Sequence, residues 1–139
     1  MTRVVATGVF EIIHPGHIFF LNEAKKLGDE LVVIVARDTT AKKRKRHPVI
    51  NENQRLKVVQ SLKPVDKAIL GDITDFFKPI LRINPDILVL GPNQNFNPKH
   101  LELEFKNRNL KIKIVRLKKM LKGKSKSSKK IIERIKKSR

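Results

Sequence analysis

The fold of this 139-residue chain is decided by one stretch near its start, residues 4–17, which reads VVATGVFEIIHPGH. Its first part, Val4–Val9, is nearly continuously apolar, as expected of a parallel strand buried on both faces. A turn with Pro15 and Gly16 follows, and a segment with apolar residues at helical spacing begins at His17. A strand that leads through a turn into a helix is the opening unit of an α/β sheet.

The same alternation continues along the chain. Short runs rich in Val and Ile predict further strands at Leu31–Ala36, Ala68–Leu70, Ile87–Leu90 and Ile112–Leu117. Helical spacing predicts helices over residues 17–27, 52–62, 74–83, 97–108 and 127–137. Strands and helices that alternate in this way predict one domain over residues 1–139. Its fold class is α/β, a doubly wound, Rossmann-like sheet of five parallel strands with right-handed crossovers.

Several residues have the properties of helix caps. Gly28 is a predicted C-cap of the first helix. Asn51 followed by Gln54 resembles a capping box, and Thr74 or Asp75 can cap the helix that ends near Ile83.

In a doubly wound sheet the ligand lies outside the carboxyl ends of the strands, at the topological switch point. Functional residues are therefore expected in the segments that follow the strands, namely residues 7–17, 37–45, 91–95 and 117–128.

The first of these segments places His14 and His17 at the start of a helix. The unpaired amides and the dipole of a helix start favour a phosphate, and Gly16 lets the backbone approach it. Two imidazoles three residues apart can add donors to the same phosphate, which is the positioning that phosphoryl chemistry requires. The alternatives are a metal site, for which no third ligand is close in sequence, and turn histidines bound only to the backbone.

The charge of the chain indicates an anionic partner. Its 32 Lys and Arg residues against 13 Asp and Glu give a formal net charge of +19, which attracts nucleotides, nucleic acid or an anionic membrane face. The chain has no cysteine, no recognisable signal peptide and no apolar run of the length that spans a membrane. A soluble, cytoplasmic protein without disulfides is expected.

In these features the chain resembles the cytidylyltransferase-like family of nucleotidyltransferases. The family hallmark, Gly-x-Phe-Asp-x-x-His-x-Gly-His after the first strand, matches residues 8–17 with one difference, Glu11 in place of the usual Asp. The resemblance implies that this segment binds the nucleotide through Thr7, Gly8, Val9, Phe10, His14, Gly16 and His17.

Three further stretches carry the resemblance. Arg37-Asp38 with Lys42 and Lys43 is similar to the family's second strand and mobile basic loop. Residues 52–55 match a Glu-x-x-Arg element whose arginine, here Arg55, helps to hold the nucleotide site together. Ser127 and Ser128 resemble the serine-rich helix start that binds the β- and γ-phosphates, so the basic segment from about 118 to 139 would complete the phosphate site.

Residues 63–71 and 85–94, which include the predicted nucleotide-binding Gly91 and Asn93, most resemble the archaeal-type FAD synthases. That resemblance implies transfer of AMP from ATP to FMN, with His14, His17 and Lys42 as catalytic residues. It also implies a divalent metal ion, with Mg²⁺ favoured, held by phosphate oxygens and water without a protein cage.

Other interpretations stay open at this stage. The same chemistry could use CTP and glycerol 3-phosphate or another phosphorylated acceptor. A different class is a basic nucleic-acid-binding protein, although the chain has no Trp or Tyr to stack on bases; a regulatory nucleotide-binding domain is a third. We expect that the protein binds neither a specific nucleic acid nor a membrane. His47 and His100 are expected at the surface. Whether the protein forms a homodimer is left open.

Overall fold

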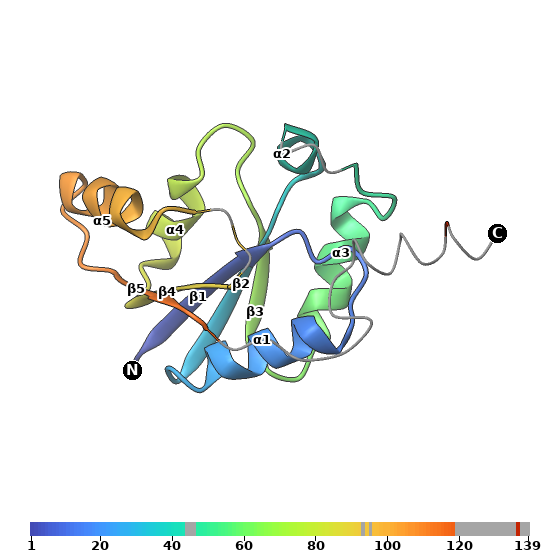
Figure 1. The fold of residues 1–139 in the computed structure, drawn as a ribbon, viewed down its shortest axis with the longest axis horizontal. Coiled ribbons are helices and arrows are strands. Elements are labelled where there is room, and N and C mark those ends of the chain that lie inside the picture. The colour runs from blue at the N-terminus through green and yellow to red at the C-terminus, as the bar shows by residue number, and fades with distance from the viewer. Residues whose placement is uncertain (44–46, 93, 95, 119–135, 137–139) are drawn as a thin grey trace.

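A computed structural model of the protein describes residues 1–43, 47–92, 94, 96–118 and 136. One five-stranded sheet with the order β3-β2-β1-β4-β5 forms its centre, and every pairing in it is parallel. The strands are β1 (Arg3–Gly8), β2 (Glu30–Val35), β3 (Lys67–Leu70), β4 (Ile87–Leu90) and β5 (Lys113–Arg116) (Figure 1). Each begins and ends within one residue of its predicted bounds, and the predicted fold class is confirmed.

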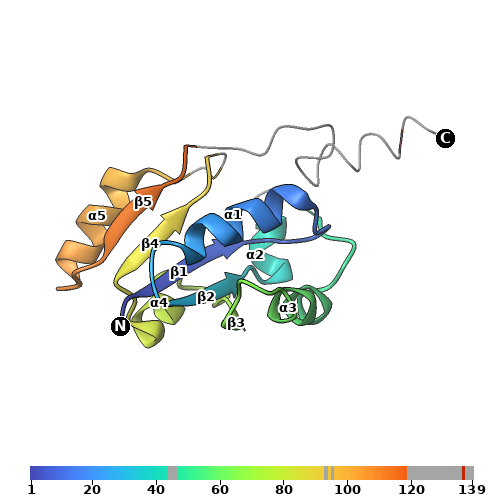
Figure 2. The ribbon, with the colours of Figure 1, turned by 90° about the horizontal axis from the view of Figure 1, so that it is seen from below.

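Helices cover both faces of this sheet. One face carries α1 (Pro15–Lys25) and α3 (Glu52–Gln60), and the other carries α4 (Phe77–Ile83) and α5 (Pro98–Asn107) (Figures 1 and 2). A short helix, α2 (Asp38–Lys43), follows the carboxyl end of β2. The five helices and the sheet give the layered arrangement that a doubly wound fold requires.

The continuous apolar strands are explained by two cores, one on each face of the sheet. Val4 and Ala6 of β1 point into the core under α1 and α3, whereas Val5 between them points into the core under α4 and α5. Neighbouring residues of β2 divide in the same way, Val33 to the first core and Ile34 to the second. Because both faces are covered, the central positions of these strands are almost all apolar.

The structure corrects the predicted cap of α1 and adds one helix. Lys26, not Gly28, is the C-cap of α1. Gly28 is required for a different reason: a Cβ at this position would lie 2.7 Å from the carbonyl oxygen of Thr2. The sequence predicted a basic loop after β2, but the first part of that segment is α2.

Of the other predicted caps, that of α3 is confirmed. Oδ1 of Asn51 accepts from the backbone N–H of Gln54 at 2.9 Å, which caps α3. The N-cap of α4 is Phe76 and not the predicted Thr74 or Asp75, although Oδ1 of Asp75 accepts from the N–H of Phe77 at 2.9 Å just before it. The predicted helix over residues 127–137 lies outside the described residues, except for position 136.

The topology defines where a ligand can enter. The chain leaves β1 toward α1 on one face of the sheet and leaves the adjacent strand β4 toward α5 on the other face. The two connections separate above the carboxyl ends of β1 and β4, which makes this the switch point of the sheet.

Candidate active site

The turn after β1 is shaped by a steric fit between Gly8 and Phe10. A Cβ on Gly8 would lie 2.8 Å from the Phe10 ring, which is closer than a carbon atom can approach. Phe10 itself is buried and has a φ of 52°, a left-handed conformation that is uncommon for a residue with a side chain. The glycine and the aromatic residue of the motif therefore shape the backbone that leads to the histidines.

His14 and His17 cap the first turn of α1 together. Nδ1 of His14 accepts from the N–H of Gly16 at 3.0 Å, and Nδ1 of His17 accepts from the N–H of His14 at 3.2 Å. In the neutral imidazoles the proton is therefore on Nε2 in both residues. The ring centroids are 4.0 Å apart, so the structure brings the two predicted catalytic histidines together.

The environment of His14 keeps its imidazole neutral. The side chain is buried, and this burial lowers the pKa of His14 below its ordinary value because the charged form is desolvated. Its Nε2 is buried and has no hydrogen-bond partner among the described residues. A buried N–H without an acceptor costs free energy, and a phosphate oxygen of a ligand would satisfy it.

Glu11, the one difference from the family motif, binds the backbone that precedes α3. Its buried carboxylate accepts from the backbone N–H of Val49 and, at 3.4 Å, from that of Ile50. The longer glutamate side chain thus connects the turn after β1 with the segment that precedes α3.

Arg55 is fully buried and binds the surrounding backbone. NH1 donates to the carbonyl oxygens of Val9 at 2.7 Å and Ala36 at 2.9 Å, and Nε donates to that of Ile50 at 2.9 Å. NH2 forms an ion pair with Asp38 at 2.6 Å. The sequence placed Arg55 among the nucleotide-binding residues, whereas its burial and these partners favour a positioning role without direct contact to a nucleotide.

A second set of ion pairs holds α2 against the start of α3. Oε1 of Glu52 accepts from the N–H of Asp38 at 2.9 Å, and Oε2 pairs with Arg37 at 2.8 Å. Lys42 and Lys43 stand exposed in the last turn of α2. Lys42 and Lys43 therefore belong to the helix α2. Arg55 connects the start of this helix to the turn after β1, and Glu52 connects it to α3.

Two residues that the sequence did not identify brace the carboxyl ends of β1, β4 and β5. Gln94 accepts from the N–H of Gly91 at 2.8 Å and donates to the carbonyl oxygen of Thr7 at 2.8 Å. Arg116, at the end of β5, donates to the carbonyl oxygens of Gly91 and Gln94 and also to that of Phe96. The predicted nucleotide-binding Thr7 and Gly91 are thus joined, but the Gly91 N–H is already occupied.

Three predicted nucleotide-binding residues, Asn93, Ser127 and Ser128, lie outside the described residues. Within the described ranges no group of three or more His, Cys, Asp or Glu residues could hold a metal ion. This part of the chain also holds no helix of the length and apolar character needed to cross a membrane. His47 and His100 are exposed, as predicted.

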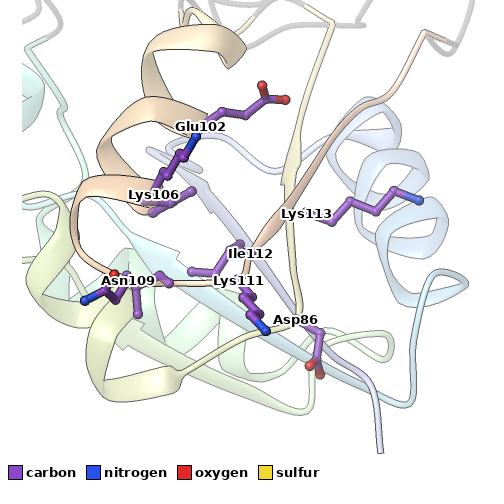
Figure 3. A pocket seen from close by; sticks show the side chains of 9 residues that line it. Asp86, Glu102, Lys106, Asn109, Lys111, Ile112 and Lys113 are labelled. Atoms are coloured by element: carbon purple, nitrogen blue, oxygen red, sulfur yellow. The ribbon is translucent and has the colours of Figure 1, made fainter.

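A hollow of about 630 Å³ lies elsewhere, between α5 and the segment that leads into β5 (Figure 3). Its lining comprises Asp86, Glu102, Phe105, Lys106, Asn109, Leu110, Lys111, Ile112 and Lys113. Asp86 precedes β4 and Lys113 begins β5, so the hollow is at the amino ends of these strands. The histidines follow the carboxyl end of β1, so the hollow lies at the opposite ends of the strands and is separate from the site that the histidines form.

The fold and the histidine pair define a doubly wound α/β protein with a His-x-Gly-His motif that follows its first strand. The cytidylyltransferase-like family matches residues 5–134, and the chain belongs to this family, which confirms the predicted resemblance.

Relatives of known name agree with that assignment. An FAD synthase of Archaeoglobus profundus is 58% identical, with 97% of this chain and 86% of the relative covered. An FAD synthase of Methanothermus fervidus is 56% identical, with 95% and 93% covered.

Among solved structures, a protein of Thermoplasma volcanium described as a lipopolysaccharide core biosynthesis protein has a TM-score of 0.84 and 49% identity, over 86% of this chain and 98% of that one. A pantothenate synthetase of Thermus thermophilus, at 11% identity and a TM-score of 0.59, shares the fold; the match covers 84% of this chain and 55% of that one.

Proposed function

We propose that the protein is an FMN adenylyltransferase, which transfers AMP from ATP to FMN and releases pyrophosphate. The observation that carries the proposal is the pair of Nε2 atoms at the start of α1, that of His14 being buried without a partner among the residues that the structure describes. Relatives of 52–58% identity that are named FAD synthase support the choice of ATP and FMN.

The chemistry follows from these donors. An oxygen of the FMN phosphate attacks the α-phosphorus of ATP in line, the new P–O bond forms, and the bond to pyrophosphate breaks. His14 and His17 donate hydrogen bonds to the phosphate oxygens on which charge accumulates, which lowers the barrier. The attacking phosphate is already ionised, so the protein supplies position and electrostatic stabilisation, not a base.

Other groups complete the site in this proposal. Lys42, with Lys43 beside it, would approach the triphosphate from α2, and Ser127 and Ser128 would bind the departing pyrophosphate. The chain acts as one domain, with the basic segment from about 118 to 139 as part of the phosphate site. Mg²⁺ would be held by phosphate oxygens and water, since the described residues offer no protein cage for it.

The test is a substrate screen with the full chain. Pyrophosphate release is measured for ATP with FMN and for CTP with glycerol 3-phosphate, each with Mg²⁺, and FAD is identified by chromatography. We expect FAD from the first pair and little turnover of the second.

The matched control is His100→Ala, an exposed histidine on α5 that should leave the rate unchanged. Turnover of CTP with glycerol 3-phosphate, together with no FAD from ATP and FMN, would contradict the proposed substrates. Tight, salt-resistant binding to one nucleic-acid sequence, without turnover of either pair, would favour the nucleic-acid-binding class.

A further inference from the structure

In-line displacement places the acceptor and the leaving pyrophosphate on opposite sides of the α-phosphorus. The histidine donors stand at the start of α1, on the face of the sheet that α1 and α3 cover. A triphosphate bound there leaves the other side of the switch point, next to α4 and α5, for the acceptor. The ring of the acceptor should therefore contact residues at the carboxyl edge of that second face.

Two phenylalanines occupy this position. Phe96 follows β4, and Phe76 precedes α4 at the end of the connection from β3, which arches over the carboxyl edge (Figure 1). Their ring centroids are 5.2 Å apart with an interplanar angle of 33°. Both residues pack on the core of the second face but are only half-buried, and Ile73 nearby in sequence is 51% exposed.

The position of Phe96 is fixed relative to the histidine turn. Arg116 donates to its carbonyl oxygen and to that of Gln94. The Gln94 amide donates in turn to Thr7, the residue before Gly8 of the motif. These three hydrogen bonds connect the segment that carries this ring to the end of β1, across the switch point from α1.

We propose that Phe76 and Phe96 form the platform on which the isoalloxazine ring of the acceptor stacks. The inference rests on the proposed function, because it requires that the acceptor be FMN. A flavin joins a flat aromatic ring to a phosphate through a flexible ribityl chain. The ring lies on the phenylalanines while the phosphate reaches the α-phosphorus near His14 and His17. Base stacking on aromatic side chains contributes substantially to affinity in other proteins, and a flavin ring has the same kind of π-face.

The remaining aromatic residues of the chain do not fit this role. The chain has no Trp and no Tyr, so Phe is its only ring of this kind. Phe10 and Phe105 are buried, and Phe77 packs edge-on against Phe105 with the guanidinium of Arg108 over its ring. Phe19 and Phe20 are on α1, the side assigned to the triphosphate.

The experiment is a fluorescence titration of FMN in the absence of ATP, with the full chain and the variants Phe76→Leu and Phe96→Leu. Leucine keeps the apolar contact with the core but removes the ring. We expect each variant to bind FMN about 5- to 100-fold more weakly, the range measured for loss of one stacking side chain. Phe96→Tyr keeps a ring and should bind like the wild type.

Two controls separate stacking from general damage. Leu103→Ala removes an exposed apolar side chain of α5 outside the platform, and it should leave FMN affinity unchanged. Ribitol 5-phosphate, which lacks the ring, should inhibit the wild type and Phe96→Leu equally. FAD synthesis by the wild type with unaltered FMN affinity in both leucine variants would overturn the platform alone. Absence of FAD synthesis by the wild type would instead overturn the proposed function.

Discussion

Replacing Arg55 with Met should destabilise the whole fold. Arg55 is fully buried, and its guanidinium donates to three backbone carbonyl oxygens and to Asp38. Methionine preserves an unbranched apolar stem but leaves these four acceptors without their donor. Three of them belong to the connections that shape the switch point, at Val9, Ala36 and Ile50.

The size of the effect follows from the burial. The three part-buried carbonyl oxygens left without a donor cost about 1 kcal/mol or more each, and Asp38, whose side chain is 32% exposed, adds about 1 kcal/mol, which together gives about 3–5 kcal/mol. Domains of this kind have unfolding free energies of about 5–15 kcal/mol, so the loss is a large share of the total. At about 4 °C per kcal/mol for a chain of this length, the melting temperature should fall by roughly 12–20 °C.

Urea unfolding of the two proteins at equal concentration measures this difference directly. The matched control is Arg37→Met, since Arg37 also makes an ion pair and a bond to a carbonyl oxygen but has a side chain that is 33% exposed. We expect the control to lose about 1 kcal/mol or less, as exposed pairs do. An equal loss of unfolding free energy in both variants would refute the argument that burial makes the contribution of Arg55 to stability the larger one.

Three further changes test the same site. His17→Ala should lower the single-turnover rate by about 10²–10³, because one donor to the transferring phosphoryl group is lost, and should lower the melting temperature by only a few degrees through the lost capping bond; an unchanged rate would contradict the catalytic role. Glu11→Ala should reduce the unfolding free energy by about 1.5–3 kcal/mol, measured in urea, whereas Glu23→Ala on the surface should change it by less than about 1 kcal/mol. Acidification should destabilise the protein through His14. Its folded pKa lies below the unfolded value of 6.5, so the unfolded chain takes up the proton first and stability falls as the pH drops through this range. Melting temperatures at about pH 7.5 and about pH 5.5 should therefore differ more in the wild type than in His14→Gln; equal differences would contradict this assignment.

Much of the fold could be predicted because its signals are local. Strands buried on both faces are apolar at nearly every central position, so β1 and β2 can be recognised as apolar runs in the sequence. The helix α2 was missed because it is short, begins at the acidic residue Asp38 and includes two threonines of low helix propensity. The close packing of Gly28 against Thr2 also has no local signal, since a glycine after a helix has the same appearance as a C-cap.

The same distinction applies to the site: contacts between residues close in sequence could be predicted, and contacts between distant residues could not. The spacing of His14 and His17 on one helix turn predicts that their imidazoles lie together, and they do. Gln94 and Arg116 could not be identified, because their partners are 87 and 25 residues away in sequence, respectively. Arg55 was predicted as part of the site, but its complete burial contradicts the usual exposure of arginine and could be found only from the structure.

The contact between Gly8 and Phe10 has an evolutionary consequence. A Cβ on Gly8 would collide with the Phe10 ring, and that ring is buried in the core under α1 and cannot swing away. The two positions therefore accept substitution only as a pair: any side chain gained at position 8 requires a smaller residue at position 10. Descendants of this sequence should show correlated changes at these positions. A library randomised at both should yield folded combinations that neither single-site library contains.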